Sequence, residues 1–126
     1  DRILDFFPQT QHQQVRMQLA LNLKAAICQR LIPRAPGDGL IPAVEVLMVT
    51  PAVSKLIREN RIGKLVPAMQ SGTEDGMQTF NMSLAKLINN KLITLEDALS
   101  KSTNPEGLKM NMKGIYLDED RKILGE

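Results

Sequence analysis

Cysteine, histidine and aromatic residues are scarce in this sequence of 126 residues. A single cysteine, Cys28, excludes an intrachain disulfide and a zinc site built from cysteines. The single histidine, His12, lies in a Gln-rich segment, and we interpret it as a solvated residue near a helix start rather than a catalytic base. With three Phe, one Tyr and no Trp, the core must be built mainly from aliphatic side chains and Met.

Long apolar runs and clustered charges are also missing. No run approaches the roughly 20 residues of a membrane-spanning helix, and no signal-peptide pattern is present. The net charge is +2, and the 16 basic residues are scattered rather than gathered into a stripe. We therefore expect a cytoplasmic protein with no nucleic-acid partner, because phosphate backbones are bound by clustered Lys and Arg.

No phosphate-binding loop is visible in the sequence. Gly63-Lys64 is the only Gly-Lys pair, and it lacks the earlier Gly and the following Ser or Thr that such a loop needs. The acidic run Asp118 to Asp120 lacks the spacing of a calcium loop, so we interpret it as a solvated turn. Cys28 is expected to be buried filler on a helix face. The residues alone predict no catalytic group, no cofactor-binding group and no metal ligand.

The periodicity of apolar residues predicts a mainly helical α/β protein with one short antiparallel hairpin. The hairpin is expected from a short strand near 30–33, a turn at Arg34 to Gly39 and an apolar strand at Ile41 to Val49. The chain is expected to begin with the end of a helix over 1–7. Further helices are expected from about 14 to 29, over 50–60, over 62–70 and from about 77 to 89. The segment Thr94-Leu-Glu-Asp97 resembles a capping box and is expected to start another short helix, and one more helix is expected from about Pro105 to before Gly114. A second small hairpin is expected in the tail 114–126.

The clearest of these elements is the helix at Thr50 to Asn60. Pro51 has a φ angle that suits the first helical position, and Thr50 before it can cap the free backbone N–H groups. Val53, Leu56 and Ile57 recur at the spacing of one apolar helix face. The charged residues of this segment are therefore expected to point away from the core.

The order of several motifs resembles the C-terminal part of PilT-type ATPases, the retraction motors of type IV pili in twitching motility. The matching segments, in family order, are Asp1-Arg-Ile-Leu-Asp-Phe-Phe-Pro8, Gln14 to Ala20, Gln29 to Arg34, Glu45 to Val49, Ala52-Val-Ser-Lys-Leu-Ile-Arg-Glu59, Gly76 to Thr79 and Leu92 to Leu99. The segment at 52–59 is similar to the family motif AIRNLIRE. Seven such matches in the right order are far more specific than any one of them.

Two positions of that motif differ from the family. Ser54 and Lys55 stand where the motif has Arg and Asn, whereas Val53 replaces Ile conservatively. The motif residues that match, and that the resemblance implies carry the family role, are Ala52, Leu56, Ile57, Arg58 and Glu59. A lone cysteine also distinguishes the chain from the pilus-assembly branch, which carries a four-cysteine zinc module.

The resemblance implies the C-terminal portion of a RecA-like ATPase domain over residues 1–113, followed by a tail at 114–126. It also implies a hexameric parent protein at the cytoplasmic face of the inner membrane, with a pilus platform protein as partner and with ATP and Mg²⁺ as cofactors. The Walker motifs and the histidine box would lie before Asp1, so this part alone is expected to bind no cofactor and to be inactive. Arg58 and Glu59 would make polar contacts across a subunit or domain interface.

Two alternatives remain open from the sequence. The chain could be a stand-alone helical protein-interaction module without motor activity, and Arg58 and Glu59 could be solvated charges without a partner. A Walker A motif some distance before Asp1 in the gene would decide between the motor and the module.

Overall fold

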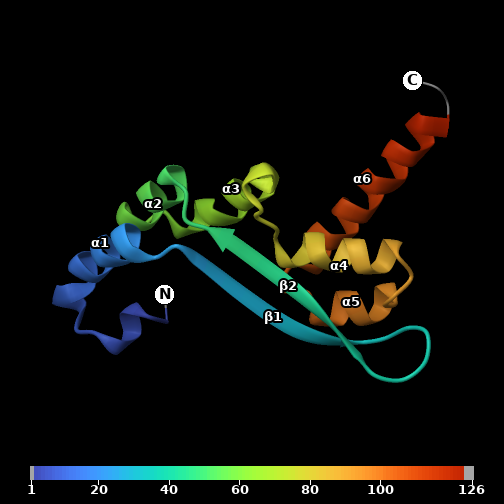
Figure 1. The fold of residues 1–126 in the computed structure, drawn as a ribbon, viewed down its shortest axis with the longest axis horizontal. Coiled ribbons are helices and arrows are strands. Elements are labelled where there is room, and N and C mark those ends of the chain that lie inside the picture. The colour runs from blue at the N-terminus through green and yellow to red at the C-terminus, as the bar shows by residue number, and fades with distance from the viewer. Residues whose placement is uncertain (1, 124–126) are drawn as a thin grey trace. The chain divides into compact units, whose positions relative to one another are not determined.

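The computed structural model describes residues 2–123, and the side chains of residues 2–114. Helix α1 precedes a strand pair, and the other α-helices follow it along the chain (Figure 1). The longer elements are α1 (His12–Asn22), β1 (Ala25–Pro33), β2 (Leu40–Met48), α2 (Pro51–Arg58), α3 (Leu65–Ser71), α4 (Phe80–Asn89), α5 (Leu95–Lys101) and α6 (Pro105–Ile123). Short 3-10 turns lie at Leu4–Phe6, Gln9–Gln11, Ile62–Lys64 and Thr73–Asp75. No helix within residues 2–123 is long and apolar enough to cross a bilayer.

The chain forms two compact units. The first consists of residues 1–27 and 46–78, and the second of residues 28–45 and 79–126. Helices α1, α2 and α3 belong to the first unit, and α4, α5 and α6 belong to the second. The strand pair contributes to both, because each strand crosses from one unit to the other within its length.

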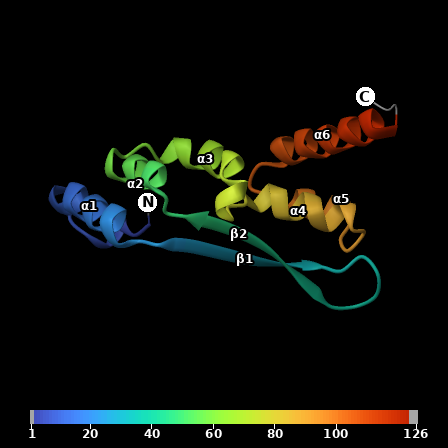
Figure 2. The ribbon, with the colours of Figure 1, turned by 45° about the horizontal axis from the view of Figure 1, so that its top comes forward.

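Strands β1 and β2 form the predicted antiparallel hairpin (Figure 2). At its open end the N–H of Val49 donates to the carbonyl of Lys24 at 2.9 Å, and at the turn the N–H of Arg34 donates to the carbonyl of Gly39 at 3.0 Å. The turn needs glycine, since Gly37 and Gly39 have φ angles of 85° and 106°. The predicted hairpin, and with it the α/β fold class, is confirmed.

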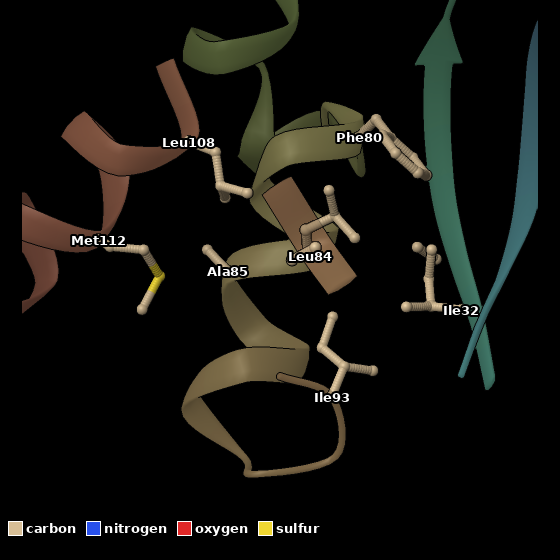
Figure 3. Packing of buried hydrophobic residues seen from close by; sticks show 9 residues of the cluster. Ile32, Phe80, Leu84, Ala85, Ile93, Leu108 and Met112 are labelled. Atoms are coloured by element: carbon tan, nitrogen blue, oxygen red, sulfur yellow. The ribbon is translucent and has the colours of Figure 1, made fainter. Parts of the chain in front are cut away.

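The core of the second unit surrounds Leu84, which is fully buried on α4 (Figure 3). Leu84 belongs to a cluster of buried side chains from both strands, from α4, α5 and α6, and from the segment before α5. The other members are Ile32, Ala43, Phe80, Ala85, Ile93, Ala98, Leu108 and Met112. The Ser83 hydroxyl accepts a hydrogen bond from the N–H of Val44 at 3.0 Å. Helix α4 is thus fixed to β2 by both apolar contact and a polar bond.

Two charged side chains of the hairpin bind helix ends in the second unit. Glu45 accepts a hydrogen bond from the N–H of Phe80, at the start of α4, at 3.1 Å. Arg30 donates to the carbonyl of Lys101, at the end of α5, at 3.0 Å, and its guanidinium lies 5.0 Å from the centre of the Phe80 ring. Each charge has the sign that stabilises the helix end it meets, so the polar groups of the hairpin reinforce the apolar core.

The first unit has a separate core between α1, α2 and α3. Its buried members are Ala20, Val53, Ile57, Met69 and Met77. Helices α1 and α2 lie side by side in both ribbon views (Figures 1 and 2). Because Ala20 and Val53 are small, the two helix backbones can approach closely at this contact.

The helix expected to extend to about Gln29 is shorter than predicted. It ends at Asn22, and Leu23 has already turned to an extended conformation with ψ of 129°. Residues 25–29 instead belong to β1, where pairing with β2 satisfies their backbone groups. Cys28 is therefore exposed on a strand, and its predicted role as buried helix filler is wrong.

Two predictions about the chain ends also need correction. Residues 4–6 form a 3-10 turn rather than the end of an α-helix. The last helix does not stop before Gly114 but continues to Ile123. The hairpin expected in the tail is therefore wrong for residues 114–123. A glycine inside a helix costs only about 1 kcal/mol, and the Glu, Lys, Arg and Leu residues that follow favour helix. Residues 124–126, and the side chains of Asp118 to Asp120, lie outside the description.

Candidate functional site

Helix α2 begins as its sequence predicts. The Thr50 side chain accepts a hydrogen bond from the N–H of Val53 at 3.3 Å, and Pro51 is the first helical residue. The helix ends where the chain turns back, with Asn60 in the left-handed region at φ of 58°. There the N–H of Arg61 donates to the carbonyl of Leu56 at 2.8 Å. Both ends of α2 are therefore fixed by hydrogen bonds and backbone conformations of neighbouring residues in the sequence.

The matched motif residues divide between the two sides of α2. Ile57 is buried in the core of the first unit together with Val53, and Leu56 is half-buried. Ala52, Arg58 and Glu59 are exposed. The packing residues and the residues available to a partner are thus clearly separated.

Ser54 joins α2 to α1 through one hydrogen bond. Its hydroxyl donates to the carbonyl of Ala20 at 2.7 Å. Ala20 lies in the last turn of α1, where carbonyl groups lack the helical N–H partner they would otherwise have. Ser54 therefore caps the end of α1 from a neighbouring helix, and a position where the chain differs from the motif has a structural role.

We predict that Ser54→Ala lowers the free energy of unfolding by about 1 kcal/mol, because the Ala20 carbonyl loses its partner. Ser100→Ala in α5 is the matched control, since Ser100 bonds only to Asp97 in its own helix. Both replacements gain the better helix propensity of Ala, so their difference in urea unfolding isolates the bond. Equal midpoints for the two variants would rule out this role for Ser54.

The charged end of α2 has one internal ion pair. The Glu59 carboxylate lies 3.8 Å from the Arg61 guanidinium, and both side chains are at least one-third exposed. Neither Arg58 nor Lys55 makes a hydrogen bond or ion pair with any side chain described in residues 2–114. An exposed pair such as Glu59–Arg61 contributes little to stability, so this surface is not needed to hold the fold.

An apolar groove of about 670 Å³ lies elsewhere in the first unit, along α1. Its apolar lining comes from Ile3, Phe7, Val15, Leu19 and Leu23, and its polar lining consists of Gln and Asn side chains. No titratable side chain lines the groove. It can therefore take an apolar segment but supplies no acid, base or nucleophile.

His12 serves the local fold. It is the first residue of α1, and its Nε2 atom is hydrogen-bonded to the carbonyl of Phe7 at 3.0 Å. A general base needs a substrate proton within reach and usually an orienting partner. His12 instead closes the turn before α1, as its position in the sequence suggested.

Single-sequence reasoning missed the two polar bonds that position the helices. The bond from Ser54 to Ala20 has no signal in the sequence, because serine inside a helix is common and its acceptor lies 34 residues away. Glu45 did carry a signal, since it is the one charged residue in an apolar strand. Such a residue must find a polar partner when the strand is covered, and that partner is the first N–H of α4.

The chain is similar in sequence to proteins of type IV pili. It is 42% identical over 121 residues to the type IV pilus ATPase PilU of Pseudomonas aeruginosa, an alignment that covers 95% of this chain and 32% of PilU. It is 39% identical to the PilT retraction ATPase of the same organism, and 39% identical to a twitching motility protein of Neisseria gonorrhoeae. These two alignments cover 84% and 86% of this chain, and 30% and 29% of the relatives. A comparison with models of known protein families finds no match.

Solved structures give the same result. The crystal structure of the pilus retraction motor PilT with bound ADP superposes with a TM-score of 0.76 at 40% identity, over 86% of this chain and 30% of that one. The Yersinia pseudotuberculosis ATPase DotB has a TM-score of 0.63 at 18% identity, over 86% of this chain and 26% of DotB, and so shares the fold alone. The chain spans about a third of the length of its curated relatives. The chain is homologous to a part of the PilT-type ATPases of type IV pili and has the fold of the corresponding part of their RecA-like ATPase domain.

Proposed function

We propose that this chain is the C-terminal part of an ATP-driven motor that retracts type IV pili. The observation that supports this most directly is the likeness to the PilT retraction motor, at 40% identity over 86% of the chain. In the proposed role, the chain completes the motor domain and transmits movement, while nucleotide chemistry takes place in a preceding part of the protein.

The nucleotide would be bound outside this chain. The solved PilT structure holds ADP, yet the sequence here has no phosphate-binding loop. We propose that the parent protein uses ATP with Mg²⁺, forms a hexameric ring, and works at the cytoplasmic face of the inner membrane on a pilus platform protein. Within the chain, the exposed motif residues Arg58 and Glu59 would supply contacts to another subunit or domain.

The proposal predicts a specific defect in cells that lack the full-length protein carrying this chain. They should still assemble pili but should lose pilus retraction and twitching. Re-expression of the full-length protein should restore both, whereas the 126-residue chain alone should restore neither, since its sequence has no phosphate-binding loop. The measurement is pilus retraction by fluorescence microscopy, with twitching zones scored in parallel.

Normal retraction in the deletion strain, or rescue by the 126-residue chain alone, would contradict the proposed motor function. Rescue by the chain alone would instead favour a stand-alone helical interaction module. A related pilus ATPase could mask the defect, so the deletion is also made in a strain without other retraction motors.

A further inference from the structure

The end of α2 carries an excess of positive charge. Residues 51–64 include the cations Lys55, Arg58, Arg61 and Lys64 and the single anion Glu59, all of them exposed. Glu59 is already paired with Arg61. Arg58 therefore remains as an exposed guanidinium with no ion pair among the side chains of residues 2–114.

A second arginine, Arg16, lies on α1, the helix that packs against α2. Arg16 is half-buried, and its Nε atom is buried without any hydrogen-bond partner among the described residues. Buried donors of this kind are rare because an unpaired one is costly. Arg16 is the one buried side-chain donor that the described part of the chain leaves without a partner.

Helix geometry brings Arg16 and Arg58 toward the same end of the α1–α2 pair. The Ser54–Ala20 bond fixes where the two helices meet, and the bond from Val49 to Lys24 shows that α2 begins beside the end of α1. Arg16 is one turn before Ala20 and Arg58 is one turn after Ser54. This spacing therefore places both arginines toward the same end of the helix pair, the end away from the start of α2.

We propose that Arg16 and Arg58 together bind a carboxylate on an acidic surface of a partner protein. This inference rests on the proposed function, because it names the chemistry of the contact that α2 would make in the motor. Guanidinium groups match carboxylates through paired, charge-assisted hydrogen bonds. Two of them on adjacent helices can hold one Asp or Glu of the partner and fix its orientation.

A protein carboxylate fits this surface better than a polyanion does. Nucleic acids and anionic bilayers present rows of phosphates and are bound by many clustered cations. Here the exposed carboxylate of Glu59 follows Arg58 directly and would repel a second negative charge nearby. Because Glu59 is paired with Arg61, a single partner carboxylate at Arg58 meets less repulsion than a row of phosphates would.

The test is a charge series at Arg58 in the full-length protein, with retraction rate and ATPase rate measured for each variant. Arg58→Lys should keep most of the retraction rate, and Arg58→Gln should lower it by about tenfold. Arg58→Glu should lower it further, because two carboxylates would then face each other. Arg16→Gln should show a smaller loss of the same kind. Lys24→Gln, which removes an exposed cation at the opposite end of the helix pair, should have no effect.

The outcomes separate this inference from the proposed function. Equal losses of retraction rate in Arg58→Gln and Arg58→Glu would rule out an acidic partner surface but would not contradict the proposed motor function. An unaffected Arg16→Gln variant would overturn the two-arginine site. Binding of the chain to vesicles containing phosphatidylglycerol, lost in Arg58→Glu, would assign the site to lipid and overturn the proposal. If Arg58→Glu loses ATPase activity through misfolding, the retraction rates of Arg58→Lys and Arg58→Gln still test the proposal. Equal rates for these two variants would overturn it.

Discussion

Leu84→Ala should lower the free energy of unfolding by about 3 to 4 kcal/mol, the largest stability effect we expect from one truncation in the second unit. Leu84 is fully buried, and the other members of its cluster come from both strands, from α4, α5 and α6, and from the segment before α5. Removing its side chain loses apolar burial and leaves a cavity that these elements cannot all close. Urea unfolding followed by circular dichroism measures the change.

Two variants control for the chemistry of this substitution. Leu95→Ala makes the same replacement at a side chain that is 46% exposed, and it should cost about 0.5 kcal/mol or less. Leu84→Met conserves volume and should cost less than about 1.5 kcal/mol. If Leu84→Ala were no more destabilising than Leu95→Ala, the core described for the second unit would be wrong.

The elements that could be predicted from the sequence are those with local signals. Thr50 and Pro51 define the start of α2 by their own chemistry, and the cap bond is present. Gly37 and Gly39 allow the turn of the hairpin through their positive φ angles. Thr94 likewise accepts a bond from the N–H of Asp97 at 3.1 Å, which confirms the predicted cap of α5. Each of these features depends on residues within a few positions of one another.

The elements predicted wrongly depend on distant residues. The segment 23–29 has an apolar spacing that suits a helix, and only pairing with β2 turns most of it into a strand. The break expected at Gly114 did not account for how little one glycine costs inside a longer helix.

The candidate site shows the same division. The sequence predicted that Val53 and Ile57 are buried and that Arg58 and Glu59 are exposed, because helical periodicity alone decides this. It could not predict that Glu59 pairs with Arg61 or that Ser54 caps α1. Of the two charged residues that match the family motif, Glu59 is therefore paired, and Arg58 has no ion pair among the side chains of residues 2–114.

The second large effect is expected on function. In the full-length protein, Arg58→Gln should reduce pilus retraction by about tenfold while leaving ATP hydrolysis within about twofold of the parent. The physical reason is that Arg58 is exposed and makes no ion pair among the side chains of residues 2–114. Its loss should not disturb the fold, nor the nucleotide site that we propose for a preceding part of the protein. It should remove a contact through which hydrolysis becomes movement.

The most direct test of this account is to measure both rates on the same Arg58→Gln protein, with Lys24→Gln as the control. ATPase activity is measured on the purified full-length protein, and retraction is measured in cells that express it at the parental level. The account predicts hydrolysis near the parental rate together with a large loss of retraction, and two normal rates for the control. Unchanged retraction in Arg58→Gln, or an equal loss of both rates, would contradict the claim that this part of the chain couples hydrolysis to movement.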